Sequence, residues 1–187
     1  MKALILFSGG LDSTTCLAKA IQDFDEVEAL SFNYGQKHIK ELDHAVSIAD
    51  YYGIKLKIYD ITGLVEKSES DYIPFRNTIF LSIALSYAEQ NNIDVIIYGA
   101  NSADYDSFPD CRLPYVEAIN NLVKTHTMKI IIITPIINTP KTEIIKLAKS
   151  LDVPIEMTWT CYEGTELPCG KCNSCLLRDK AFKEISC

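Results

Sequence analysis

The chain has 187 residues, of which 48% are hydrophobic and 10% aromatic, enough to bury the core of one domain or of one domain with a small appendage. Its formal net charge of −7 disfavours broad binding to nucleic acid or to anionic membranes. No apolar run is long enough to span a bilayer, and the apolar start at residues 3–7 ends too soon for a signal peptide, which predicts a cytoplasmic location.

Strands and helices are expected to alternate along most of the chain. The expected strands are residues 2–7, 26–33, 55–60, 94–99 and 129–134. The expected helices are residues 13–23, 37–52, 76–90 and 115–125, and a last one that Thr139-Pro140 opens and that ends at residue 150; residues 61–74 and 102–114 are expected to be loops. This alternation predicts an α/β fold with a doubly wound, mostly parallel sheet, whose ligands bind at the carboxyl ends of the strands.

The most informative motif follows the first expected strand. Two glycines, Gly9 and Gly10, precede a helix start, where unpaired backbone N–H groups and the helix dipole favour an anion. The motif lacks the Gly-Lys-Ser/Thr ending of a Walker A loop and the third glycine of a dinucleotide fingerprint. It resembles instead the pyrophosphate loop (PP-loop) of the ATP pyrophosphatase superfamily; a tight, capped turn is the alternative. The expected ATP-binding residues are Phe7, Ser8, Gly9, Gly10, Leu11, Asp12, Ser13, Thr14 and Thr15.

Four of the seven cysteines gather near the end of the chain: Cys161, Cys169, Cys172 and Cys175. Four thiolates at this spacing suit a tetrahedral Zn²⁺ with no open position, hence a structural site. Disulfides, loose thiols and an iron–sulfur cluster are the alternatives. Because apolar residues are scarce here, metal would replace a core. The spacing therefore predicts an ATP-binding α/β domain over residues 1–157 and a small zinc-binding segment over 158–187 packed on it.

Further blocks of sequence point, together with these motifs, to one family. They are Tyr34-Gly35-Gln36-Lys37-His38 with Glu41, Pro74-Phe75-Arg76-Asn77, Asp104 through Phe108-Pro109-Asp110-Cys111-Arg112, Lys141-Thr142-Glu143, Thr160-Cys161-Tyr162, and the ending Cys-Gly-x-Cys-x-x-Cys-x-x-Arg. In this order they resemble the 7-cyano-7-deazaguanine synthases, the nitrile-forming family of the queuosine pathway. The chain departs from the family pattern in its shorter loop between residues 60 and 74 and at Phe75, Asp106, Ser107 and Phe108.

The resemblance implies an adenine nucleotide alpha-hydrolase-like fold and a C–N ligase that turns 7-carboxy-7-deazaguanine, ammonia and ATP into a nitrile through an adenylated acid and an amide. It implies ATP, Mg²⁺ and a structural Zn²⁺, small-molecule substrates, no nucleic-acid or membrane partner, and a chain that can form a homodimer. The residues assigned to catalysis are Ser8, Asp12, Arg76 and Lys141. The residues assigned to the substrate are Tyr34, Gln36, His38, Asn77, Asp104, Phe108, Asp110 and Arg112.

Each assignment has a simpler alternative. Asp12 could cap its helix, and Arg76 and Lys141 could be ordinary solvated cations. His38 fits a polar wall of the pocket better than a catalytic base. Asp110 and Arg112 could form a loop salt bridge. For the whole chain, the rivals are a relative that thiolates tRNA with the same ATP chemistry and a nucleotide-binding zinc module without turnover.

Overall fold

Five parallel strands form the centre of the protein, whose computed structural model describes residues 1–65, 72–126, 129–164 and 166–185. In chain order the strands are β1 (Lys2–Leu6), β2 (Glu26–Asn33), β3 (Lys55–Asp60), β4 (Val95–Ile97) and β5 (Ile131–Ile133). They lie in the order β3-β2-β1-β4-β5, and every neighbouring pair is parallel. The predicted parallel α/β sheet is confirmed.

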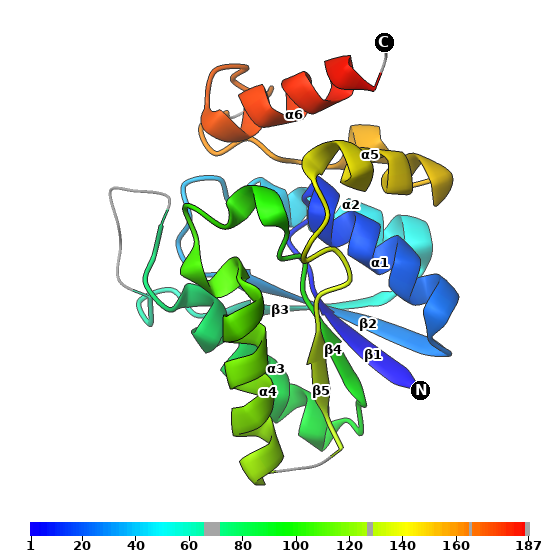
Figure 1. The fold of residues 1–187 in the computed structure, drawn as a ribbon, viewed down its shortest axis with the longest axis vertical. Coiled ribbons are helices and arrows are strands. Elements are labelled where there is room, and N and C mark those ends of the chain that lie inside the picture. Colours follow the sequence, from blue (N-terminus) through cyan, green and yellow to red (C-terminus); the bar gives the residue numbers. More distant parts are fainter. Residues whose placement is uncertain (66–71, 127–128, 165, 186–187) are drawn as a thin grey trace.

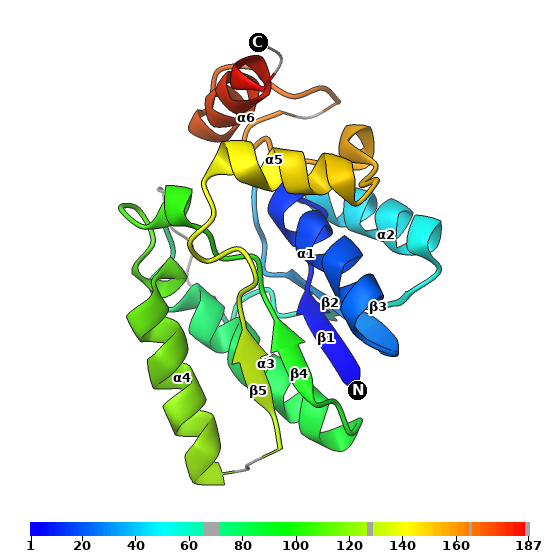
Figure 2. The same cartoon turned by 45° about the vertical axis from the view of Figure 1, so that its right-hand side comes forward.

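Helices cover both faces of this sheet (Figures 1 and 2). One layer holds α1 (Leu11–Asp23), α2 (Glu41–Tyr52) and α5 (Lys141–Ser150); the other holds α3 (Arg76–Gln90) and α4 (Leu113–His126). Alternate residues of β1 divide between the two cores: Ile5 packs with Leu17 and Ile48 beneath the first layer, and Leu4 packs against Leu81 under the second. This alternation is why the central strand reads as a continuous apolar run.

The strand order sets the position of the site. The chain leaves β1 toward β2 on one side and reaches β4 on the other, so the order reverses between β1 and β4. Loops that follow these two strands therefore open a crevice at the carboxyl edge of the sheet. The loop after β1 contains the glycine motif, and the segment after β4 contains two short 3-10 helices, Ser102–Asp104 and Pro109–Cys111, in the predicted loop.

Two parts of the chain differ from the prediction. The helix expected over 37–52 begins only at Glu41, because residues 38–41 form a tight turn in which the Glu41 N–H donates to the His38 carbonyl at 3.0 Å. A further helix, α6 (Asn173–Glu184), follows α5, so the helix ending at residue 150 is not the last. Only Cys175 and Ala181 of α6 are buried, whereas Leu176 and Leu177 are exposed, so the apolar residues of α6 do not form a helical period.

A buried carboxylate lies far from the carboxyl edge of the sheet, near the start of β2. Glu28 is 5% exposed and forms ion pairs with Lys2 Nζ at 2.7 Å and Lys55 Nζ at 3.0 Å. Burial alone would raise the pKa of Glu28, but hydrogen bonds from Lys2, Tyr87 and Lys55 outweigh burial and lower the pKa from its ordinary 4.5 to about 2. The pair network joins β1, β2 and β3.

The Glu28 network should make stability depend on pH. Because the folded-state pKa is lowered, the stabilisation is complete above about pH 4.5 and is lost as the pH falls toward 2. We expect Glu28→Gln to remove about 2 to 3 kcal/mol of this acid-dependent stability, measured by urea unfolding at pH 5.5 and pH 3. Glu26→Gln is the control, because Glu26 pairs with the same Lys2 but is 61% exposed. Equal pH profiles for Glu28→Gln and the unmodified chain would contradict the assignment.

Among the described residues, no helix has the length and apolar character needed to cross a membrane.

Candidate functional site

The loop between β1 and α1 brings its backbone very close to α2. Gly9 has φ +76°, and a Cβ there would lie 2.6 Å from the Ala45 nitrogen and 2.8 Å from the Glu41 carbonyl oxygen. Only glycine fits this left-handed conformation and this approach. Inside the loop, Ser8 Oγ accepts from the Gly10 N–H at 3.2 Å and lies 3.1 Å from Ser13 Oγ. These contacts fix the loop as a turn at the start of α1.

Six of the nine expected ATP-binding residues line one cavity of about 250 Å³: Phe7, Ser8, Gly10, Leu11, Asp12 and Ser13. The other three, Gly9, Thr14 and Thr15, do not line the cavity. The Thr14 hydroxyl donates to the Gly10 carbonyl at 2.7 Å, and the Thr15 hydroxyl donates to the Leu11 carbonyl at 2.7 Å. Since both threonines are fully buried, these bonds make them supports of the helix start.

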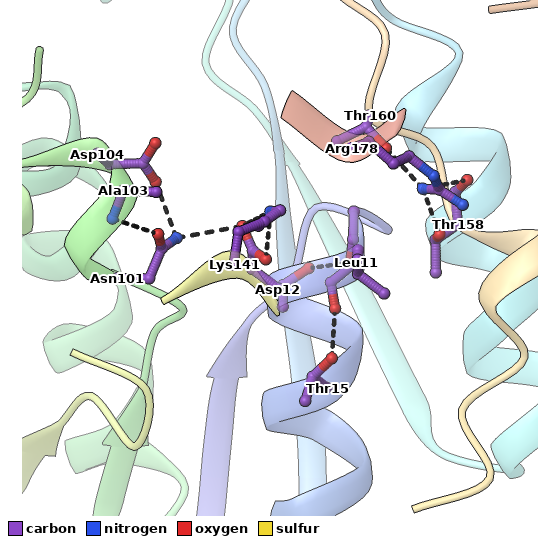
Figure 3. A network of polar contacts seen from close by, with 12 residues as sticks. Leu11, Asp12, Thr15, Asn101, Ala103, Asp104, Lys141, Thr158, Thr160 and Arg178 are labelled. Atoms are coloured by element: carbon purple, nitrogen blue, oxygen red, sulfur yellow. Dashed lines mark hydrogen bonds and ion pairs between the residues drawn. The ribbon is translucent and has the colours of Figure 1, made fainter. Parts of the chain in front are cut away.

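Asp12 does not cap its helix; its carboxylate joins three elements (Figure 3). Lys141 Nζ, from the first residue of α5, lies 2.6 and 2.7 Å from the two carboxylate oxygens. Asn101, which follows β4, donates from Nδ2 to Asp12 at 3.2 Å and to Asp104 at 2.9 Å. Burial and the neighbouring Asp12 carboxylate raise the pKa of Asp104. Asn101 is 1% exposed and was not among the expected residues, because its position depends on strand order.

The same cavity gathers part of the expected substrate set. Tyr34, His38, Asn77 and Asp104 line it, together with Arg76. Arg76 Nη1 donates to the Tyr34 hydroxyl at 3.3 Å, and its guanidinium lies over the Tyr34 ring. Arg76 Nε is buried and has no hydrogen-bond partner among the described residues. Arg76 is therefore a half-buried cation of the cavity and not a solvated residue at the start of a helix.

Phe75, the residue before Arg76, has an unusual backbone conformation. It precedes α3 with φ 56° and ψ 18°, in the left-handed region, while its side chain is 71% exposed. A residue other than glycine is strained in this region by about 1 to 2 kcal/mol. The observed conformation explains why a glycine fits the motif before Arg-Asn, the position at which this chain departs from the family pattern.

Four expected substrate residues lie outside the lining of this cavity: Gln36, Phe108, Asp110 and Arg112. Asp110 and Arg112 do not form the alternative salt bridge. The Arg112 Nε–H donates to the Tyr105 carbonyl at 2.8 Å, and Asp110 Oδ1 is buried with no hydrogen-bond partner among the described residues. A role for Asp110 toward substrate stays a prediction.

Gln36 acts on Glu41, a residue that the sequence did not single out for a role. Gln36 Oε1 accepts from the Tyr34 backbone N–H at 2.9 Å, and Gln36 Nε2 donates to the Phe32 backbone carbonyl and to Glu41 Oε1, each at 3.1 Å. Its amide is fully used within the protein. Glu41 lines the cavity, and its second oxygen, Oε2, lies 3.5 Å from His38 Nε2.

The four clustered cysteines converge on one point. The sulfur atoms of Cys161, Cys169, Cys172 and Cys175 all lie within 4.8 Å of one another, so the cluster could hold a metal ion. Backbone N–H groups of Gly164 and Cys169 donate to Cys161 Sγ at 2.9 and 3.2 Å, as they would to a thiolate. The cluster adjoins the cavity, because Cys161 and Tyr162 also line the cavity wall.

Arg178, from α6, fastens the C-terminal segment to this wall (Figure 3). Its Nη1 donates to the Thr160 and Thr158 hydroxyls at 2.6 and 2.8 Å, and its Nη2 donates to the Ile155 carbonyl at 2.9 Å. The backbone N–H of the neighbouring Trp159 donates to the Gly9 carbonyl at 3.0 Å. Arg178 thereby connects α6, through residues 158–160, to the loop after β1.

We expect Arg178→Ala to destabilise the docking of α6 by about 2 to 3 kcal/mol, because a charged donor with several acceptors is removed. Chemical unfolding and hydrogen exchange of the α6 amides measure this effect. Lys180→Ala on the same helix is the control; its ion pair to Glu184 is long, at 3.9 Å, and exposed, so we expect a change below about 0.5 kcal/mol. Equal losses in the two variants would contradict this role for Arg178.

A known protein family matches nearly the whole chain. The family model described as queuosine biosynthesis protein QueC matches residues 2–70 and 63–186. A 7-cyano-7-deazaguanine synthase of Trichodesmium erythraeum is 43% identical over an alignment of 215 residues that includes 99% of this chain and 97% of the relative. Another from Thermoplasma volcanium is 41% identical over 209 residues, with 98% and 87% covered.

Solved structures share the fold at low sequence identity. The U34-tRNA thiolase NcsA of Methanococcus maripaludis, solved with its [4Fe-4S] cluster, has a TM-score of 0.60 at 20% identity, covering all of this chain and 64% of the thiolase. An NH3-dependent NAD synthetase of Campylobacter jejuni has a TM-score of 0.58 at 20% identity, covering 83% of this chain and 66% of the synthetase. Both likenesses concern the fold alone.

Proposed function

Because this chain belongs to the queuosine biosynthesis protein QueC family and is an enzyme of the PP-loop superfamily, we propose that it converts 7-carboxy-7-deazaguanine, ammonia and ATP into 7-cyano-7-deazaguanine. The observation that carries the proposal is a single cavity. It joins the phosphate loop, with Ser8 and Asp12, to the half-buried cation Arg76 and to Asn77. Such a cavity can hold a triphosphate and an acid side by side.

In the proposed reaction the carboxylate of the acid attacks the α-phosphorus of ATP, and pyrophosphate leaves. Ammonia then displaces AMP to give an amide, whose oxygen is activated in turn before the nitrile forms. Ser8, Ser13 and the free N–H groups at the start of α1 hold the phosphates, and Arg76 and Lys141 offset their charge. No covalent intermediate with the protein is needed.

Two metals are part of the proposal. Mg²⁺ would neutralise phosphate charge when bound, and Asp12 is the carboxylate that we assign to it, because Mg²⁺ prefers carboxylate oxygens and Asp12 lines the cavity beside the phosphate loop. Zn²⁺ would bind the four cysteines. A tetrahedral site with zinc–sulfur bonds of about 2.3 Å separates its sulfurs by about 3.8 Å, near the 4.0 Å between Cys161 and Cys172. A [4Fe-4S] cluster binds each thiolate to a different iron and would need wider spacing between the sulfurs.

The test is direct incubation of the protein with the acid, ATP and ammonium chloride, with mass detection of the product. Formation of the nitrile together with AMP or ADP would support the proposal. ATP cleavage that requires a tRNA and a sulfur donor would favour the thiolating alternative. ATP binding with no cleavage would favour a module without turnover. A homodimer, a cytoplasmic location and the division at residues 157 and 158 stay predictions.

A further inference from the structure

Among the described residues three carboxylates line the cavity, Asp12, Asp104 and Glu41, and only Asp12 is paired with a lysine or an arginine. Asp12 is paired with Lys141, and Asp104 accepts a hydrogen bond from Asn101. No lysine or arginine of the described ranges lies within 4.0 Å of the Glu41 carboxylate, whose ionic contact is His38 at 3.5 Å. A carboxylate in a cavity without a fixed cation suits a cationic ligand.

The neighbours of Glu41 fix the position of its carboxylate. Gln36 donates to Oε1, so Oε2, which lies 3.5 Å from His38 Nε2, is the oxygen that a ligand would approach. The Tyr34 and Tyr162 rings also line the cavity, and the His38 and Tyr162 rings pack with centroids 5.0 Å apart. Aromatic faces beside a carboxylate favour a small cation with N–H donors.

We propose that Glu41 receives ammonium at this place and takes a proton from it, so that neutral ammonia forms inside the cavity. The inference rests on the proposed function, in which ammonia is the nitrogen donor. Ammonium in solution carries no lone pair and cannot attack a carbonyl carbon. A base next to the activated acid removes this obstacle at the point of use.

Ammonium gives one proton to Glu41 Oε2, leaving ammonia and a neutral carboxyl group. The ammonia nitrogen bonds to the acyl carbon, and the bond from this carbon to the AMP oxygen breaks, with AMP taking the electron pair. The nitrogen then loses a second proton to water, which leaves the amide. Glu41 releases its own proton to water before the next turnover.

The surroundings favour this proton exchange. Burial raises the pKa of Glu41 to about 7, against the opposing effects of the Gln36 hydrogen bond and of the Arg76 charge. The titratable or charged groups that face Glu41 are His38, Arg76, Tyr34 and Tyr162. A carboxyl with this pKa is a stronger base than an ordinary glutamate and still changes protonation near neutral pH. Phosphate and substrate carboxylate groups would offset the charge of Arg76 during the reaction.

The experiment measures initial rates of product formation at saturating ATP and acid, with the ammonium concentration varied from pH 7 to pH 9. For Glu41→Gln we expect the KM for total ammonium to rise at least about tenfold at pH 7, with the KM for the acid and for ATP changed less than about threefold. The variant should depend on free ammonia alone. Its KM for total ammonium should therefore fall about tenfold per pH unit, while that of the unmodified chain stays nearly constant.

Asp43→Asn is the matched control, because Asp43 is an exposed acid in the same first turn of α2, and it should leave the ammonium dependence unchanged. Glu41→Asp keeps the charge, so we expect a smaller rise in the KM for ammonium than in Glu41→Gln. If Glu41→Gln does not fold, Glu41→Asp provides the test in its place. A rise in the KM for the acid instead would assign Glu41 to the substrate ring and overturn the proposal, as would an unchanged ammonium dependence. Absence of product from the unmodified chain would overturn the proposed function itself.

Discussion

Replacing Asp12 by asparagine is expected to lower the rate of product formation at least about 100-fold. The carboxylate receives Lys141 Nζ at 2.6 and 2.7 Å and Asn101 Nδ2 at 3.2 Å, so it sets the position of both side chains beside the phosphate loop. Asparagine has the same shape but no charge, so Lys141 loses its ion pair and the proposed magnesium ligand is lost. The assay measures nitrile by mass spectrometry and pyrophosphate release from labelled ATP.

The stability of Asp12→Asn should change little by comparison. The two side chains of the pair are 16% and 23% exposed, so breaking the pair is expected to cost about 1 to 2 kcal/mol in chemical unfolding. Asp23→Asn is the control on the same helix: Asp23 pairs with Lys19 at 2.9 Å, but both are exposed. We expect it to keep full activity. Activity of Asp12→Asn within about threefold of the unmodified chain would make Asp12 a structural residue.

Local features of the sequence predicted the fold and part of the site well. Short apolar runs indicated strands buried on both faces, and α3 begins and ends where the periodicity placed it, at Arg76 and Gln90. The glycines of the phosphate loop and the four cysteines were found because each set is close in sequence. The geometry of a contiguous motif can be predicted from the sequence, because the turn or the helix start that positions the reactive groups is encoded beside those groups.

Contacts between distant segments were beyond such reasoning. Asn101 reaches Asp12 because β4 lies beside β1, and a single sequence does not give the strand order that brings these residues together. Glu41 gained its place in the cavity from the tight turn before α2, where a longer helix was expected. The α6 helix is held by Arg178, by the cysteine cluster and by a small apolar contact of Ala181 and Phe182 with α5, and this contact is too short to give a hydrophobic period.

Cys172→Ser is expected to remove the metal from the cluster and to release the C-terminal segment from the rest of the protein. In small zinc sites the metal contributes about 10 kcal/mol or more of apparent binding energy, which acts as folding energy. Among the described residues, Trp159, Cys161 and Cys175 form the buried core around this cluster, so without the metal α6 keeps only the Arg178 contacts and its packing on α5. Elemental analysis should give one zinc per unmodified chain and a loss of zinc in the variant.

Hydrogen exchange separates this local release from global unfolding. Amides of α6 should exchange at least about 100-fold faster in Cys172→Ser or after chelation, while those of β1 and β4 keep their protection. Product formation should also fall in Cys172→Ser and after chelation, because Cys161 and Tyr162 line the cavity wall. Cys16→Ala is the control: Cys16 is buried in the core beneath α1, so the variant should lose about 1 kcal/mol of stability and keep its zinc. Iron with a visible absorption band, or unchanged exchange in α6 after chelation, would contradict a structural zinc site.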